Sequence, residues 1–235
     1  MFLRVSLGET LVSYYAFAVE LVQNLAGEPE ILCNNAGGNF IEAWEDVELK
    51  EINFYNPDES IEAKLVPKKK YGVLAVQVTE LKCGGVVVGC TFDHRVVDAY
   101  SFNMFLVSWA ELALSKPLSH PTILSFSAAS LFLRSLHEFL ERAVTKEHFL
   151  GLINWVENHR LEPALARIYA TDEDTPALVV PSGQQFPVRK IEFGWGEAVF
   201  GSYHFPWEGK SGYVMSMLSP KGNGDWIVER PNRFG

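Results

Sequence analysis

TFDHRVVDAYSF, residues 91–102, joins two segments that differ in hydrophobic period. The run before it, GGVVVGC (84–90), is continuous and rich in β-branched residues, which is typical of a buried strand. From Ser101 onward apolar residues recur every three or four positions, and this spacing predicts an amphipathic helix that ends near Lys116-Pro117. The stretch is therefore predicted to be a strand-turn-helix junction, and it carries a histidine and an aspartate four residues apart.

These two residues, His94 and Asp98, allow two interpretations. A histidine after a buried strand stands where α/β proteins commonly present reactive side chains, and imidazoles exchange protons near neutral pH. Alternatively, His94 is a polar residue whose hydrogen bonds are satisfied, and Asp98 is the N-cap of the following helix. A short motif also occurs by chance, so the spacing alone leaves both interpretations open.

Spacing argues against two other chemistries at this junction. A metal site would need further ligands, and neither His148 nor His204 lies at a spacing that brings it to His94, so no metal is predicted. Cys90 precedes His94 by four residues, which an extended strand separates by about 13 Å. We therefore expect Cys90 to be a small buried residue rather than a nucleophile.

Composition excludes several classes of function. The chain of 235 residues has a formal net charge of −9 and a pI near 5.2, so nucleic acid is not an expected partner. The short basic run Lys68-Lys69-Lys70 favours a solvated turn over a phosphate-binding site and is left unassigned. Three cysteines without a CxxC pair predict a reducing, cytoplasmic location. No stretch has the apolar length to span a bilayer, so no membrane association is expected.

Outside the junction, the pattern predicts further elements. Residues 71–81 and 84–92 are expected to form a hairpin, and the second of these strands to be a central one. A domain boundary is expected within 117–144. Other predicted elements are a helix over 7–21, a hairpin of 31–34 with 39–43, a helix over 145–160 that Thr145 caps, and strands at 177–181, 186–195, 211–218 and 225–230.

A second stretch, IEFGWGEAVFG (191–201), alternates glycines with aromatic residues. The glycines do not fit the dinucleotide fingerprint, and no βαβ unit surrounds them. Glycine allows backbones to approach closely, and large rings can fill the remaining space. The stretch is predicted to have an architectural role.

Together, HRVVD (94–98) and EFGWG (192–196) resemble the paired H-x-x-x-D and D-F-G-W-G signatures of the plant BAHD acyltransferases, in the same order. The resemblance extends over nearly the whole chain apart from 117–144. It implies an α/β (α+β) fold of the chloramphenicol acetyltransferase type, with a channel between two domains. The N-terminal domain, 1–134, would carry the first signature, and an incomplete C-terminal domain, 135–235, the second.

The resemblance also implies a chemistry. His94 would be the general base for direct transfer of a hydroxycinnamoyl or other aromatic acyl group from acyl-CoA to a hydroxyl or amine of a plant metabolite. Acyl-CoA would be a co-substrate, with no bound cofactor, and full-length relatives would be monomeric. Asp98 would point away from the channel and fix the imidazole. The second signature would be a structural motif made of Glu192, Phe193, Gly194, Trp195 and Gly196.

The sequence departs from the family pattern at two points. Glu192 replaces the signature aspartate, and it follows His94 by only 98 residues, less than half the usual interval. A segment around residues 135–145 that would carry much of the CoA-contacting surface is therefore expected to be absent. The alternative to an acyltransferase is a non-catalytic chain that keeps part of the fold and at most binds a ligand or a protein.

Overall fold

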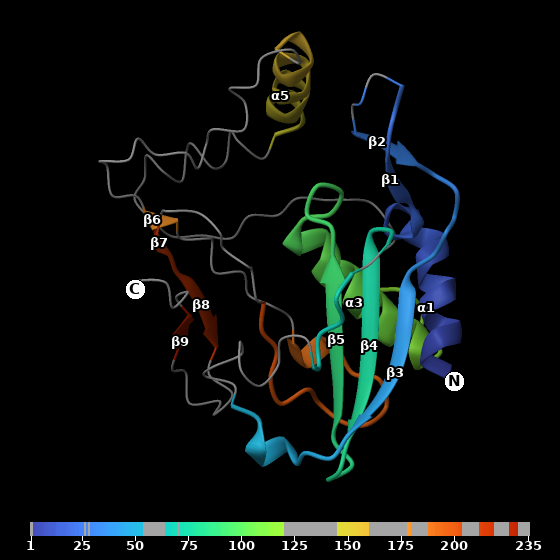
Figure 1. Cartoon of the computed structure of the whole chain (residues 1–235), viewed down its shortest axis with the longest axis vertical. Coiled ribbons are helices and arrows are strands. Elements are labelled where there is room, and N and C mark those ends of the chain that lie inside the picture. Colours follow the sequence, from blue (N-terminus) through green and yellow to red (C-terminus); the bar gives the residue numbers. More distant parts are fainter. Residues whose placement is uncertain are drawn as a thin grey trace. The chain divides into compact units, whose positions relative to one another are not determined.

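The computed structural model divides into two compact units (Figure 1). It describes residues 2–25, 27, 29–53, 64–69, 71–119, 145–159, 178–179, 188–203, 212–218 and 226–229. The first unit comprises Met1–Thr122, Ser182–Phe205 and Ser216–Glu229, and the second comprises Ile123–Pro181, Pro206–Met215 and Arg230–Gly235. The predicted domain boundary between residues 134 and 135 lies outside the described residues.

The first unit contains a three-stranded sheet in the order β3-β4-β5. Its strands are β3 (Asn39–Glu45), β4 (Leu74–Leu81) and β5 (Val86–Phe92). The predicted β4-β5 hairpin is confirmed as an antiparallel pair, in which Leu74 lies opposite Phe92. The expectation that the second strand is central is wrong: β4 takes the central position, and six of its eight residues are buried.

The predicted hairpin of residues 31–34 with 39–43 is also wrong. β2 (Pro29–Leu32) pairs antiparallel with β1 (Glu20–Gln23), whereas β3 pairs parallel with β4. All four residues of β2 are exposed, so this strand has little apolar surface to bury against β3. The buried β4 needs hydrogen-bond partners for its backbone along both edges, and β3 supplies those along the edge that β5 leaves open.

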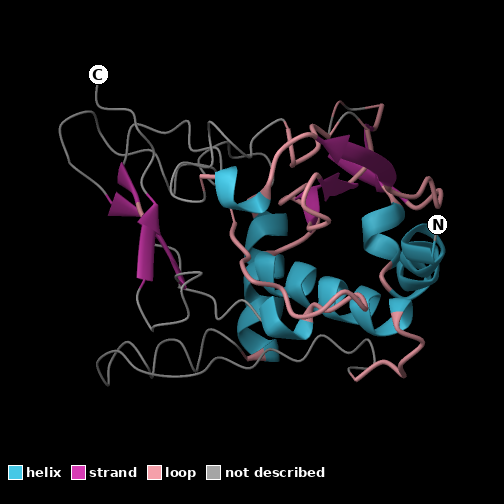
Figure 2. Ribbon diagram, turned by 90° about the horizontal axis from the view of Figure 1, so that it is seen from below, coloured by secondary structure: helices cyan, strands magenta, loops and turns pink. Residues whose placement is uncertain are grey.

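Two helices cover one face of this sheet (Figures 1 and 2). They are α1 (Phe2–Ser13) and α3 (Ala99–Ala113), and α3 confirms the helix predicted after Ser101. α1 ends earlier than the predicted 7–21 helix, because the chain tightens into the 3₁₀ helix η1 (Tyr15–Ala18) before β1. The two helices are joined by Trp109, whose fully buried indole donates hydrogen bonds to the Leu3 carbonyl and to Ser6 Oγ, both at 3.1 Å.

A short segment, residues 64–69, crosses the other face of the sheet. It is held by hydrogen bonds: Gln77 Nε2 donates to the Lys64 carbonyl at 2.6 Å, and Thr91 Oγ1 donates to the Pro67 carbonyl at 2.6 Å. At Gly89 of β5, the backbone of this segment lies so close that a Cβ would collide with the Leu65 carbonyl oxygen. Gly89 is therefore a position where the absent side chain makes room for a crossing backbone.

Beyond this sheet, the described elements are short or isolated. The predicted helix over 145–160 is confirmed as α5 (Lys146–Asn158), and the expected cap is present: the His148 amide donates to Thr145 Oγ1 at 3.2 Å. Strands are present in three of the four C-terminal ranges where they were predicted, as β6 (Leu178–Val179), β7 (Gly212–Tyr213), β8 (Met215–Leu218) and β9 (Trp226–Glu229). β6 pairs parallel with β7, and β8 lies beside β9.

The close approach at Gly89 predicts a strong effect of one added methyl group. Gly89→Ala should lower the free energy of unfolding by about 1–3 kcal/mol, because the Leu65 backbone must move. Gly8→Ala is the matched control, since nothing lies within 4 Å of a Cβ at this position in α1, and it should raise the free energy of unfolding by about 0.5–1 kcal/mol. Urea denaturation measures the free energy of unfolding of both variants. Equal values would contradict the close approach of the Leu65 backbone to Gly89.

Candidate functional site

The turn that follows β5 is built around the carboxylate of Asp93. This side chain is 8% exposed and accepts hydrogen bonds from Arg95 Nε at 2.9 Å, Arg95 Nη2 at 2.7 Å and the Arg95 amide at 3.1 Å. Lys69 Nζ forms a further bond to it at 3.0 Å. The Arg95 guanidinium, with Lys69, holds the pKa of the Asp93 carboxyl well below its usual range. Asp93 is therefore ionised in the folded protein.

The backbone of Asp93 closes the same turn. Its amide donates to the Val73 carbonyl at 2.9 Å, which continues the sheet by one residue beyond β5. Its carbonyl accepts from the amides of Val96 and Val97, both at 3.1 Å. Val97 is buried in the hydrophobic core, so the far end of the turn is anchored as well. The turn is fixed at both ends.

His94 occupies this turn and is exposed. Its ring centroid lies 5.9 Å from that of Phe92, with the ring planes tilted by 44°. Phe92 in turn stacks on Phe102 of α3, with centroids 4.4 Å apart. The structure thus places His94 just after the end of β5, next to the Phe92–Phe102 pair that joins this strand to α3. Because its side chain is exposed, solvent and small molecules can reach it.

Asp98 lies at the start of α3 and caps it. Its side chain accepts a hydrogen bond from the Ser101 amide at 2.7 Å, and its backbone is extended, as an N-cap requires. This geometry is the one that the cap interpretation describes. A cap also fixes where the turn ends and the helix begins, so Asp98 acts on the same turn that holds His94.

The solvated turn that the sequence favours for the basic run is wrong for Lys69. Its side chain is 23% exposed, and Nζ bonds both to Asp93 and to the Gly72 carbonyl at 2.9 Å. The reason is a partner 24 residues away that local spacing cannot reveal. Asp93 was missed for the same reason, and the only signal in the sequence is its position directly before His94.

The second signature forms a loop rather than the predicted strand over 186–195. The chain passes from the 3₁₀ helix η4 (Val188–Lys190) into irregular structure, with Gly194 at φ 98° and Gly196 at φ 106°. These values favour glycine and interrupt a strand. Glu192 Oε1 accepts from the amides of Gly194 at 2.5 Å and Gly196 at 3.4 Å, so its carboxylate organises the loop.

Aromatic contacts attach this loop to the helices. Phe193 is 5% exposed and meets Trp109 of α3 edge to face, with ring centroids 4.8 Å apart. Trp195 is half exposed and contacts Phe2 of α1 at 5.9 Å between centroids. A Cβ at Gly194 would touch Leu114, just beyond the end of α3. The loop therefore packs at the C-terminal end of α3.

The chain then returns along α3 to the first signature. Tyr203 hydroxyl donates to Asn103 Oδ1, and it lies 3.4 Å from the Ala99 carbonyl in the first turn of the helix. Burial raises the pKa of the Tyr203 phenol. The structure thereby brings the two signatures onto one helix, with Tyr203 close to the turn of His94. Sequence analysis missed Tyr203, because its hydrogen-bond partner Asn103 lies 100 positions earlier in the sequence.

Burial also settles the state of Cys90. Desolvation raises the pKa of its thiol to about 12, so the thiol stays protonated near neutral pH. The side chain packs against the main hydrophobic core. Cys90 is thus a small residue packed against the core, as expected, but it is partly rather than fully buried. Among the residues described, no group of three His, Cys, Asp or Glu side chains is arranged to hold a metal ion.

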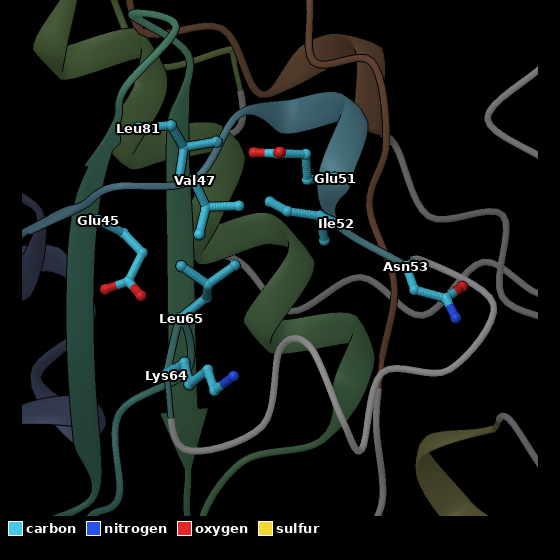
Figure 3. A pocket seen from close by; sticks show the side chains of 8 residues that line it. All are labelled: Glu45, Val47, Glu51, Ile52, Asn53, Lys64, Leu65 and Leu81. Carbon is cyan, nitrogen blue, oxygen red and sulfur yellow. The ribbon is translucent and has the colours of Figure 1, made fainter.

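A pocket of about 260 Å³ lies elsewhere on the first unit (Figure 3). Leu81, at the end of β4, lines it, whereas the His94 turn is next to Leu74 at the start of that strand. It is therefore separated from His94 by the length of the sheet. Its other lining residues are Glu45, Val47, Glu51, Ile52, Asn53, Lys64 and Leu65.

The Asp93 cluster predicts a pH-dependent contribution to stability. Asp93→Asn should lower the free energy of unfolding at pH 7 by about 1.5–3 kcal/mol. The folded-state pKa lies below the unfolded value of about 3.9, so the contribution is complete above that value and is lost as the pH falls further. The difference in free energy of unfolding between Asp93→Asn and wild type, measured by urea denaturation, should therefore become smaller below about pH 4.

The control for this test is an exposed ion pair. Asp46 and Lys82 are 2.8 Å apart with side chains 64% and 56% exposed, so Asp46→Asn should change stability by less than about 1 kcal/mol. If Asp46→Asn and Asp93→Asn lowered the free energy of unfolding equally, the buried ion pairs of Asp93 would contribute no more than an exposed pair.

The cap at Asp98 gives a separate prediction. Asp98→Ala should lower the free energy of unfolding by about 1 kcal/mol, because the Ser101 amide loses its acceptor. Asp98→Asn keeps an acceptor oxygen and should retain most of that stability. Thermal or urea unfolding distinguishes the two, and an alanine variant as stable as the asparagine variant would show that the cap contributes nothing.

No helix within the described residues is both long and apolar enough to cross a membrane.

A family model and individual relatives both relate this chain to known transferases. A model described as the Transferase family matches residues 1–132 and 124–230. A hydroxycinnamoyltransferase of Narcissus pseudonarcissus is 33% identical over 132 residues, which are 53% of this chain and 30% of that protein.

A second relative, hydroxycinnamoyl-CoA:5-hydroxyanthranilate N-hydroxycinnamoyltransferase of Avena sativa, is 34% identical over 125 residues, 50% of this chain and 28% of that protein. The chain thus spans less than a third of the length of these two relatives. The crystal structure of vinorine synthase matches with a TM-score of 0.55 at 16% identity and covers 97% of this chain and 80% of that chain. This likeness confirms the predicted α/β (α+β) acyltransferase fold. The family match covers most of the sequence, and the chain belongs to the Transferase family of BAHD-type acyltransferases.

Proposed function

We propose that this protein transfers an acyl group, hydroxycinnamoyl or another aromatic acyl, from acyl-CoA to a hydroxyl or amine of a plant metabolite. The observation that carries the proposal is an exposed histidine in a turn fixed at both ends, in a chain of this family. The name of the Avena sativa relative pairs a CoA thioester with an amine acceptor, which supports the donor and one acceptor class. The protein would act in the cytoplasm, without a bound cofactor, and its full-length relatives would be monomeric.

In the proposed mechanism His94 is the general base. The imidazole takes the proton of the acceptor hydroxyl or amine while the acceptor oxygen or nitrogen attacks the thioester carbonyl carbon. The tetrahedral intermediate then collapses, the carbon–sulfur bond breaks, and His94 returns the proton to the departing sulfur. The acyl group passes directly between substrates, so no acyl-enzyme forms.

The neighbouring residues would act through the position of His94. Asp98 fixes the end of the turn by capping α3, and this is the form in which we propose its contribution to catalysis. The loop of Glu192, Phe193, Gly194, Trp195 and Gly196 would have a structural role, because its contacts are with the helices that carry the first signature. General-base catalysis supplies roughly 10²–10⁴-fold, and alignment of the two substrates must supply the rest.

The test is acyl transfer by wild type and by His94→Ala. Hydroxycinnamoyl-, benzoyl- and acetyl-CoA would be offered with alcohol and amine acceptors. The product would be measured by mass spectrometry, since the exposed Cys33 and Cys83 would react with a thiol reagent. We expect His94→Ala to reduce the rate by about 10²–10⁴-fold. Its unfolding should be unchanged, because the side chain is exposed.

His148→Ala, in α5, is the control and should keep wild-type activity. Retained turnover in His94→Ala would exclude His94 as the base. A wild-type chain that transfers none of these acyl groups would favour the alternative, a non-catalytic chain that at most binds a ligand or a protein. The interval of 98 positions from His94 to Glu192 favours that alternative, because it leaves little chain for a CoA-contacting surface.

A further inference from the structure

We propose that Asp93 is a positioning residue for His94, which it holds by binding Lys69 and Arg95 on two different segments. The significance of this inference for catalysis rests on the proposed role of His94 as the base. Asp93 itself does not contact a substrate in this proposal. It fixes the backbone from which the imidazole projects.

The first step concerns the chain on either side of His94. Asp93 and Arg95 are its two neighbours, and they are joined by three hydrogen bonds, one from the Arg95 amide and two from its guanidinium. The peptide group after His94 is therefore held by the carboxylate of the residue before it. A planar guanidinium that uses two donors on a carboxylate also limits rotation about both side chains.

The second step concerns the segment that crosses the sheet. Lys69 reaches the same carboxylate, and its Nζ is also bound to the Gly72 carbonyl, so the ammonium has fixed partners on both sides. Thr91 Oγ1 binds the Pro67 carbonyl two residues before Lys69. The Arg95 contacts fix the turn internally, whereas the Lys69 contact fixes the turn relative to the sheet.

The third step concerns charge. Two cations meet one carboxylate that is only 8% exposed, and Lys69 is itself largely covered. If Asp93 is neutralised, the largely covered Lys69 ammonium lies near the Arg95 guanidinium without the carboxylate that both bind. Removing one partner of a buried ion pair lowers stability, because the other charge stays buried without a counter-charge. We therefore expect the turn to open when Asp93 is neutralised, and to recover in part when Lys69 is neutralised as well.

The experiment observes the imidazole directly. The protein is labelled with carbon-13 at histidine Cε1, the six ring signals are recorded by NMR, and the His94 signal is assigned with His94→Gln. In Asp93→Asn we expect the His94 signal to broaden or split, and in Asp93→Asn/Lys69→Met to narrow again. The signals of His148 and His159 on and next to α5 should not change.

Two further variants separate positioning from general destabilisation. Leu7→Ala removes a buried side chain of α1 from the main hydrophobic core, and should lower the melting temperature without altering the His94 signal. Lys69→Met leaves Asp93 bound to Arg95 and should broaden the signal less than Asp93→Asn does. If Asp93→Asn does not fold, this variant and the double variant still decide the question.

Activity adds a second readout. We expect kcat of Asp93→Asn to fall about tenfold or more while KM for both substrates stays within about twofold, because the base is misplaced and binding is intact. A His94 signal that is unchanged in Asp93→Asn and Lys69→Met would overturn the proposal. If wild type transfers no acyl group, the proposed function fails, and the imidazole signal alone decides the role of Asp93.

Discussion

The packing of aromatic side chains on α3 is the interaction on which the candidate site depends. Phe102 holds the end of β5 through Phe92, and Trp109 holds both α1 and Phe193 of the second signature. Rings of this size bury large areas and prefer offset or edge-to-face contacts, so they fix both distance and orientation. One helix thereby supports two signatures that are far apart in the sequence, and without it neither the turn of His94 nor the loop of Glu192 would have a fixed support.

The elements that sequence analysis predicted correctly are those with local determinants. The β4-β5 hairpin has its turn residues at Lys82 to Gly85, and α3 has both a clear apolar face and a cap. The parallel pairing of β3 with β4 could not be read from spacing, because it depends on which strand edge is left open in the folded sheet. A strand is predicted over 186–195 from its apolar residues, but the chain forms a loop from residue 191 onward, with Gly194 and Gly196 at positive φ.

The same distinction holds for the site. His94 and Asp98 stand out in the sequence because they form a recognisable motif with the helix start. Asp93, Lys69 and Tyr203 do not stand out, since each gains its partner only when distant segments meet. The two interpretations of Asp98 are not exclusive: the carboxylate caps α3, and the start of α3 is also the end of the turn that carries His94. A single hydrogen bond can thus belong to both the fold and the site.

The two faces of the central sheet are protected in different ways. The face toward α1 and α3 is closed by a continuous hydrophobic core, whereas residues 64–69 cover the other face near Gln77 and Thr91 through hydrogen bonds to polar side chains. Lifting this cover would expose the small cluster of Ile52, Leu65 and Leu81 and leave the larger core covered, so it can open locally at a smaller free-energy cost than separation of the helices from the sheet. Such an opening would withdraw Lys69 from Asp93 while the core stayed folded. Exchange of protected amides with solvent and disorder of the His94 turn would then be two manifestations of a single local unfolding event.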